Sequence, residues 1–560
     1  MAPAGLPFPA LSAISAFPAF MFLVKRWWPT LYLLGYSMLP DYQRGLLAAC
    51  LLVLAPVTAP AEPLPSPLNH ATELTRQGEN LGLQQKVGEA IAAFNEASGL
   101  YEKLLDQNPG DIVCRQGLAS CYEKFGDMLV AYNHLDDGLA NYQKGLAIRQ
   151  ALATQAPEDP DRSQDLAKSL ARMGRVSLLQ HRLIDSLQFY KMACSTGDRL
   201  ARHNPQNYGC ISELAINQGW VGEILLLLSS YDEAADAFAL IVDTVKLSPS
   251  LGDSDLSWLV ELAANVDDAA GLIVTKKREP ALRIFEVAKD LRQQLIAGDA
   301  DNRDFKRDLA IDLVNIASLM LAGNEAQEAS SICQRTVDLL NSIDAAVDDG
   351  SKAQLALGRI LEAYGLASEQ LHRYDEALDH FNQSAAILER ANAKLPPDFG
   401  ARLQLCRVLS RCGSLLIANR RYTDALDVYE RAHMVLNAAY QTDPSDPIFG
   451  TELIVDLEAI GYVFSTQKMP IQALNSYKAA GAILEQLRRL HPESHELEET
   501  FAGTELALGK LLREQGELTD ARAAFEQCSD ILFQLSTTGH LDNQGAIWLH
   551  EADMQLRQPF

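Results

Sequence analysis

Apolar residues recur along most of the chain at spacings of three, four and seven residues, which is the periodicity of one side of an α-helix. The pattern also repeats on a larger scale, because an aromatic residue returns every 48 residues, with a single step of 47. These aromatic positions are Phe94, Tyr142, Tyr190, Phe238, Phe285, Phe381, Tyr429, Tyr477 and Phe525. Cys333 lies midway across the double gap between Phe285 and Phe381, so the sequence contains ten copies of one unit.

Further columns accompany the aromatic one. A small residue precedes it by four positions, as Ala425 precedes Tyr429, and a second small residue, Gly413 in the same copy, lies twelve positions earlier. Proline closes six of the ten copies. Small residues let two helices approach closely, and the aromatic ring fills the space between them. Each copy is therefore predicted to form two helices of about 20 residues joined by short turns.

Polar residues mark the ends of these helices. Asn108-Pro109-Gly110-Asp111 and Asp443-Pro444 are predicted to end a second helix, because proline does not continue it. Thr423-Asp424 is predicted to cap the second helix of its copy from the position just before it.

These columns resemble the tetratricopeptide (TPR) repeat, in which Gly, Ala, an aromatic residue and a closing Pro follow one another. The usual TPR unit has about 34 residues, so both helices are lengthened here, as in long-unit bacterial arrays. Two segments resemble characteristic sequences of the first and second helices of such units: Asp165-Leu166-Ala167-Lys168 and Leu146-Ala147-Ile148-Arg149. The resemblance implies an all-α, right-handed superhelical solenoid of about ten antiparallel helix hairpins. It would cover residues 70–540, and the amphipathic tail at 541–560 would form a C-terminal capping helix.

Copies five and six depart from the pattern. Ala269 and Ala317 replace the glycine, Cys333 replaces the aromatic residue, and Leu247 to Asp255 is loop-like. These departures predict an irregularity or hinge in the array, with simple drift of the repeat as the alternative.

The N-terminal head, residues 1–61, differs from the rest of the chain. Lys25 and Arg26 precede two tryptophans, and Arg44 precedes an apolar run that ends at Ala59-Pro60-Ala61. A basic region, a short apolar run and a small-x-small site are typical of a secretion signal, and the run is too short to span a membrane. We therefore predict export to the periplasm or outside, or anchoring in a membrane through the head. A cytoplasmic protein with a wrongly assigned start is the alternative. A proline-rich linker is predicted at residues 62–69.

Charge excludes one class of partner. The chain has 48 Lys and Arg against 73 Asp and Glu, a formal net charge of −25, which argues against nucleic acid as a partner. Its hydrophobic content of 48% is enough for a large core.

The sequence predicts no catalytic chemistry, cofactor or metal. It contains no metalloprotease His-Glu-x-x-His, phosphate-binding loop, Gly-x-Ser-x-Gly or kinase catalytic-loop motif. His491 and His495 lie with three glutamates in a predicted turn, where a solvated loop is expected rather than a metal site. The eight cysteines after the head follow helical patterns and contain no Cys-x-x-Cys, so buried single thiols are expected.

A partner-binding surface is predicted on the first helices of the repeats. No copy has the Lys/Asn pair with which chaperone-binding TPR proteins hold a terminal carboxylate. Two basic stripes instead mark one helical face in separate copies, and their residues are Lys168, Arg172 and Arg175, and then Arg407 and Arg411. On an acidic chain such stripes could bind an acidic peptide. The alternative is that these cations pair with neighbouring Asp and Glu.

The sequence therefore predicts a non-catalytic scaffold that binds partner proteins or peptides in a superhelical groove. The alternative is a regulatory or sensor subunit of a signalling enzyme, such as a kinase, on a separate chain. An enzyme in its own right is a third hypothesis, which the missing motifs disfavour. The sequence makes no prediction of partner identity or oligomeric state.

Overall fold

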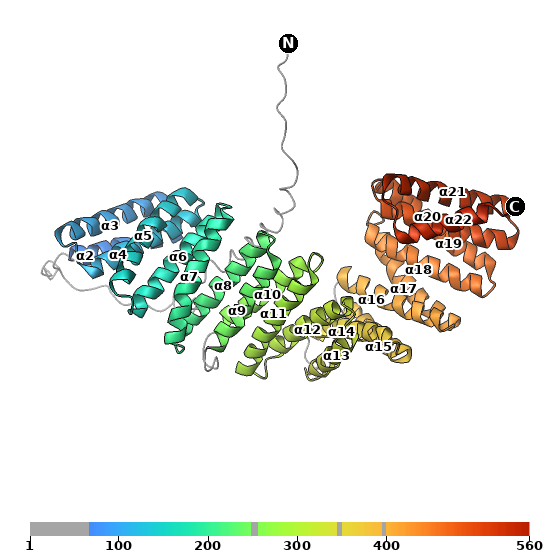
Figure 1. Ribbon diagram of the computed structural model, residues 1–560, viewed down its shortest axis with the longest axis horizontal. Coiled ribbons are helices and arrows are strands. Elements are labelled where there is room, and N and C mark those ends of the chain that lie inside the picture. Colours follow the sequence, from blue (N-terminus) through green and yellow to red (C-terminus); the bar gives the residue numbers. More distant parts are fainter. Residues whose placement is uncertain (1–65, 248–255, 344–349, 395–398, 559–560) are drawn as a thin grey trace, which may run out of the picture. The chain divides into compact units, whose positions relative to one another are not determined.

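The computed structural model describes residues 66–247, 256–343, 350–394 and 399–558, which fold into 21 α-helices with no strand among them (Figure 1). The predicted all-α class is confirmed, while the right-handed sense of the superhelix stays a prediction. The head predicted at residues 1–61 lies outside the described residues. Helix α2 begins at Pro67, so the last residues of the linker predicted at 62–69 belong to the first helix.

The described helices form two compact units, and consecutive helices within each unit pack as hairpins. The first unit contains the hairpins α2 (Pro67–Leu83) with α3 (Val87–Gln107), α4 (Ile112–Ala131) with α5 (Leu135–Gln155), α6 (Pro160–Leu179) with α7 (Leu183–His203), and α8 (Tyr208–Leu227) with α9 (Tyr231–Lys246).

The second unit contains six hairpins and a last helix. These are α10 (Ser257–Ile273) with α11 (Arg278–Gly298), α12 (Arg303–Ala322) with α13 (Ala326–Asn341), α14 (Gly350–Gln370) with α15 (Tyr374–Lys394), α16 (Phe399–Ala418) with α17 (Tyr422–Thr442), α18 (Pro447–Thr466) with α19 (Pro470–Leu490), α20 (His495–Gln515) with α21 (Leu518–Thr538), and α22 (Asn543–Leu556). The even-numbered helices α2 to α20 are called the first helices below, and the odd-numbered ones the second helices.

The glycine and aromatic columns meet inside eight of the ten hairpins, as predicted. A Cβ atom added to Gly413 of α16 would lie 2.5 Å from the ring of Tyr429 in α17. The same ring contact would form at Gly126 with Tyr142, at 2.6 Å. The glycine is needed because it lets the aromatic ring lie directly on the backbone of the first helix.

One residue in the left-handed region ends the first helix in most hairpins, which the sequence analysis did not predict. These residues are Gln85, Asn133, His181, Ser229, Asn324, His372, Arg420 and Lys468, with φ between 58° and 64°. Gly516 takes the equivalent place in α20–α21, with φ of 83°. A left-handed residue turns the chain back within a short connection, although it is unfavourable for most side chains.

Side-chain caps are found at first helices and at α22, and at none of the second helices for which a cap is described. Asp111 accepts a hydrogen bond from the Cys114 amide (3.0 Å) at the start of α4. The prediction that Thr423-Asp424 caps α17 was wrong, because α17 begins at Tyr422 and its N-cap, Arg421, makes no capping bond. Asp424 lies in the first turn, where its charge favours the helix N-terminus. The predicted ends at Asn108 and Asp443 are confirmed, since α3 ends at Gln107 and α17 at Thr442.

Copies five and six keep the hairpin packing with smaller residues. Ala269 and Ala317 are buried in α10 and α12, and Cys333 is fully buried at the aromatic position of α13. Most of the loop predicted at Leu247 to Asp255 lies outside the described residues.

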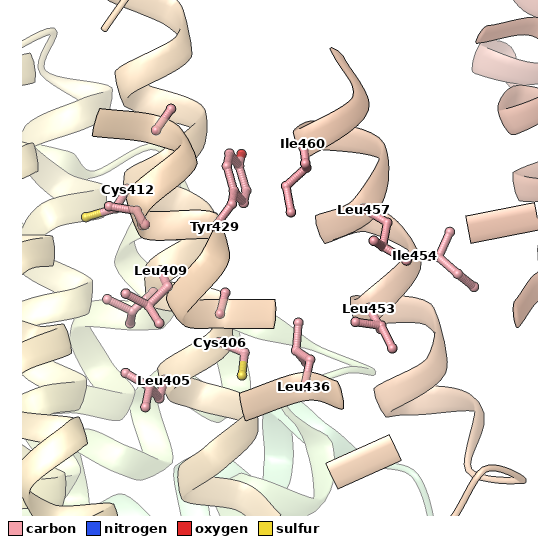
Figure 2. Close-up of a cluster of buried hydrophobic side chains, with 14 of the residues drawn as sticks. Leu405, Cys406, Leu409, Cys412, Tyr429, Leu436, Leu453, Ile454, Leu457 and Ile460 are labelled. Atoms are coloured by element: carbon pink, nitrogen blue, oxygen red, sulfur yellow. The ribbon is translucent and has the colours of Figure 1, made fainter. Parts of the chain in front are cut away.

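The second unit contains an extended apolar core that joins α14 to α20. Figure 2 shows part of it, with Ile460 on the side of α18 that faces Tyr429 of α17, and Ile454 on the opposite side. One first helix thus packs on the hairpin before it and the hairpin after it, which is how stacked repeats bury their apolar surfaces.

Helix α22 packs on the last hairpin. Trp548 and Leu549 contact the core around Ala502 and Phe525. A Cβ atom at Gly503 of α20 would lie 2.8 Å from the Trp548 ring. The predicted C-terminal tail is therefore helical and covers part of α20.

Candidate partner-binding surface

Neighbouring first helices are joined by pairs of opposite charges on their exposed side. Lys124 of α4 donates to Glu79 of α2 at 2.6 Å. The two partners are 45 residues apart in the sequence. This separation is three residues shorter than the 48-residue repeat, and three residues make about one helical turn. Each turn of a first helix therefore lies beside the next turn of the first helix before it.

The cations predicted on α6 take part in the same row of charge pairs between first helices, which we call the ladder. Arg172 Nε donates to Asp127 Oδ1 of α4 (3.2 Å), and Lys168 Nζ lies 3.0 Å from Glu213 Oε1 of α8. Burial lowers the pKa of Arg172, but the charges of Asp127 and Glu123 outweigh it and raise the pKa above its ordinary value. Two of the three predicted cations on α6 therefore have carboxylate partners, as the alternative interpretation expects.

Arg175, the third predicted cation on α6, is half-buried. Its Nε atom is buried and has no hydrogen-bond partner among the described residues. Its charge acts on two buried tyrosines, since it partly offsets the rise that burial causes in the pKa of Tyr142 and Tyr190. Arg175 thus lies among the tyrosines rather than fully in solvent.

The second unit holds the other two predicted residues. Arg407 of α16 is exposed, and its Nε donates to Glu452 Oε1 of α18 at 2.8 Å, again across 45 residues. Arg411 is also exposed, and among the described residues it has no hydrogen bond or ion pair. Its charge, with those of Arg359 and Arg407, acts on Glu362 of α14, whose pKa is raised chiefly by burial. The five predicted residues therefore form two separate groups, one in each unit.

A buried polar network behind the α4–α6 ladder was missed by sequence reasoning. Arg149 of α5 is only 6% exposed and makes a two-point contact with Glu123 of α4, at 3.1 and 3.2 Å. The same guanidinium bonds Asp165 of α6 and Ser120, and Ser169 donates to Glu123. Burial raises the pKa of Asp165, which the charge of Arg149 opposes. The only sequence signals were Arg149 and Asp165, which lie in the two TPR-like segments quoted in the sequence analysis.

No metal site is found among the described residues, where no group of three metal-binding side chains comes together. The two histidines considered earlier have other contacts. His491 Nε2 lies 3.1 Å from the Ser445 carbonyl oxygen, and the ring of His495 stacks on His540 at 3.8 Å.

The cysteines after the head are unpaired thiols, and all but the half-buried Cys194 are buried. Burial raises the pKa of Cys121 to about 11 and that of Cys406 and Cys412 to about 12. A thiol with a raised pKa holds little of the reactive thiolate at neutral pH. These side chains therefore act as small apolar groups in the core.

None of the described helices is both long enough and apolar enough to cross a membrane.

No protein-family model and no curated protein matches the chain. Several solved structures align with it at low identity. The nuclear import adaptor Nro1 of S. pombe is 11% identical over 52% of this chain and 98% of its own, with a TM-score of 0.38. Aspartyl phosphate phosphatase F of Bacillus subtilis is 13% identical over 72% of this chain and 91% of its own, with a TM-score of 0.32. A P. anserina kinesin light chain with nearly identical TPR-like repeats is 17% identical over 40% of this chain and 94% of its own, with a TM-score of 0.28.

With identities and TM-scores this low, the assignment of the fold rests on the hairpins of the chain itself. Their 48-residue period, the small residue against the aromatic ring and the consecutive packing of the helices agree with one another. The described part of the chain is an all-helical array of TPR-like hairpins.

Proposed function

We propose that this chain is a non-catalytic scaffold that binds partner proteins or peptides along its first helices. The proposal is supported chiefly by the register of these helices. Within each unit, charge pairs such as Arg172 with Asp127, or Arg407 with Glu452, join successive first helices on the same exposed side. A repeat array uses such a continuous surface for recognition, because each repeat adds one row of side chains to it.

The chemistry of this surface suits a protein ligand. Cations and carboxylates alternate along it, and the pairs are partly exposed, at 56% and 22% for Arg407 and Glu452. Exposed pairs contribute only about 0–1 kcal/mol to folding, so a charged ligand could exchange partners with them at little cost in stability. Complementary charges mainly give specificity and speed of association.

Site-specific photocrosslinking in the native host tests this proposal. A photoreactive residue is placed at Lys168 and Arg407 on first helices, and at Leu240 and Met434 on second helices as matched exposed controls. We expect protein adducts from the first-helix positions and few from the controls. Adducts from the second-helix positions alone, or none from any position, would contradict the proposal.

A regulatory subunit for a signalling enzyme on another chain stays the alternative. No feature of the described residues favours it over a simple scaffold. A crosslinked kinase whose activity changes when the purified array is added would favour the regulatory role.

We also propose that the head, residues 1–61, directs export or membrane anchoring. The support is its basic residues, apolar run and Ala59-Pro60-Ala61 site. Mass spectrometry of the mature protein after cell fractionation tests it. A product that begins near Glu62 would mean cleavage after Ala61, and an intact head in the membrane fraction would mean anchoring. An intact head in the soluble cytoplasmic fraction would contradict both.

A further inference from the structure

Helix α18 carries a row of exposed apolar side chains. Ile448 is 44% exposed, Val455 46% and Tyr462 52%, and Met469 at the end of the following turn is 37% exposed. These residues are spaced seven apart. Seven residues make nearly two helical turns, so the three residues within α18 line up along one side of the helix. We call Ile448, Val455 and Tyr462 the α18 stripe.

The stripe lies on the exposed side of α18, between the two sides on which the helix packs against its neighbours. Leu453, Leu457 and Ile460 are buried in the core of the second unit. Figure 2 shows Leu453 and Ile460 in the space between α17 and α18. At about 100° per residue, Val455 and Tyr462 lie about 140–180° round the helix from Leu453 and Leu457. The stripe is therefore not the edge of the hairpin core.

No other described first helix has this combination. At the two positions of Val455 and Tyr462, α4 has Ser120 and Asp127, and α6 has Lys168 and Arg175. Helix α16 has Arg407 and Ser414 there. Several exposed apolar side chains on one surface helix indicate an interaction site, whereas single ones are ordinary.

Helix α16 supplies a basic border beside the stripe. The bond from Arg407 to Glu452 at 2.8 Å places the guanidinium three residues before Val455 along α18. Arg411 follows one turn later on the same face of α16, exposed and without a hydrogen bond or ion pair among the described residues. Arg359 of α14 adds a third exposed cation, bonded to the neutral Asn315 at 3.3 Å. Glu362 and Glu452 are the carboxylates among these cations, and burial of Glu362 opposes its ionisation.

The spacing of the stripe indicates the conformation of its ligand. Successive stripe residues are about 10.5 Å apart along α18, which is the heptad distance of a second helix packed alongside. An extended peptide presents side chains on one face about every 6.8 Å. This spacing does not match the distance of about 10.5 Å between neighbouring stripe residues. Tyr462 belongs to a side-chain type that is enriched among the dominant contacts of protein interfaces.

We infer that the α18 stripe and its basic border bind an amphipathic helix of a partner protein, with apolar residues at heptad spacing and carboxylates along the edge that faces α16. This inference rests on the proposed scaffold function and names the partner chemistry for one segment of the first-helix surface.

The test measures binding of two synthetic helical probes of about three heptads to the full chain by fluorescence anisotropy. Both have Leu at the heptad core positions, and their flanks carry Glu in one probe and Lys in the other. We expect the Glu probe to bind the wild-type chain at least about tenfold more tightly than the Lys probe. Higher salt should reduce this preference.

Two variants and a matched control locate the site. We expect Val455→Glu to weaken the Glu probe by at least about tenfold. Arg411→Glu should weaken the Glu probe and strengthen the Lys probe, because the border changes sign. Met434→Glu, at a second-helix residue that is 66% exposed, should change neither. All three positions are exposed, so these substitutions leave the core intact.

Three results would overturn the inference. They are no binding of the Glu probe, equal binding of both probes, and equal effects of Val455→Glu and Met434→Glu. Sedimentation that shows a dimer which Val455→Glu dissolves would assign the stripe to a second copy of the chain instead. In each case, crosslinks from Lys168 on α6 would keep the scaffold proposal, and the absence of adducts from both first-helix positions would reject both.

Discussion

At the scale of single residues, this array depends on contacts that join neighbouring helices at one point. Gly413 lets the Tyr429 ring lie on α16, and Arg149 holds Glu123 and Asp165 from two first helices. The glycine contact is within one hairpin, whereas Arg149 joins successive hairpins. Both places leave little room for another side chain.

Replacing Gly413 with Leu should destabilise the α16–α17 hairpin by about 1–3 kcal/mol, because the new side chain must displace the Tyr429 ring. The measurement is the urea midpoint. Gly481→Leu in α19 is the control, since no atom lies within 4 Å of its Cβ position. There we expect a gain of up to about 1 kcal/mol from the better helix former. Equal midpoints for Gly413→Leu and wild type would contradict the assigned register.

Arg149→Met should be more damaging, with a loss of about 3–5 kcal/mol, because Glu123 would be left buried without its countercharge. The matched exposed pair is Arg202 with Asp198, where Arg202 is 66% exposed. Arg202→Met should cost less than about 1 kcal/mol. Similar losses in the two variants, compared by chemical denaturation, would mean that the Arg149 network does not stabilise the first unit.

At the scale of helices, nine of the ten hairpins share one backbone conformation at the turn, and every helix depends on how its ends are packed. Eight hairpin turns place a non-glycine residue in the left-handed region, and only α20–α21 uses glycine there. The last first helix, α20, is itself covered by α22. Turns and caps therefore decide how well each helix is held.

Gly516→Ala should lose about 1 kcal/mol, because alanine is unfavourable at φ of 83°. No atom lies within 4 Å of the added Cβ, so the effect is one of backbone conformation alone. Arg420→Gly, at φ of 59°, should gain about 0.5–1 kcal/mol for the same reason. Thermal unfolding of the pair tests this, and shifts of the same sign would refute the explanation.

The packing of α22 on α20 should become less stable as the pH rises through neutrality. Burial, then a hydrogen bond and charge from Asp542, raises the pKa of Glu499 from 4.5 to about 7. The folded protein therefore keeps a proton that the unfolded chain has lost, so this contribution is complete below about pH 4.5 and is lost above about pH 7. Hydrogen exchange of α22 between pH 5 and pH 8.5, corrected for intrinsic rates, measures it. Glu499→Gln retains His495 and His540 and should remove this dependence; an unchanged profile would assign it to other groups.

At the scale of the molecule, stability is distributed along the array. Within each of the two units, the main contacts join each helix to its neighbour or to the next helix but one. Two compact units result, and each has its own buried apolar clusters. An array of this kind unfolds by segments rather than all at once.

The α12–α13 hairpin should lose protection at lower urea concentration than α16–α17. Cys333 takes the place of the aromatic ring there, and α13 has 16 residues where α17 has 21. Both changes reduce the apolar surface buried in that hairpin. Native-state hydrogen exchange, resolved by peptide, compares the two hairpins in one experiment. Coincident loss of protection in both would contradict segmental unfolding.

Much of the fold could be predicted because its signals are local in the repeat. Gly413, Ala425 and Tyr429 lie within one copy, and their spacing follows from the geometry of one hairpin. The candidate site was harder to predict. Lys168 and Arg172 were recognised as one helical face, but their carboxylate partners lie 45 residues away in opposite directions. A search for opposite charges at that separation would have found them.

The sequence by itself determined the all-α class, the ten copies and the contact between glycine and aromatic ring in eight of the hairpins, since helical periodicity and close packing require those residue types at those spacings. Only the tertiary structure decided which charges are neutralised, which arginine is buried and which apolar residues stay exposed. Arg407 and Arg411 look alike in sequence, yet only Arg407 meets a carboxylate, and Val455 looks like Leu453 although only Leu453 is in the core. The reason is physical: burial and pairing depend on the neighbouring helices, whose placement no single repeat specifies.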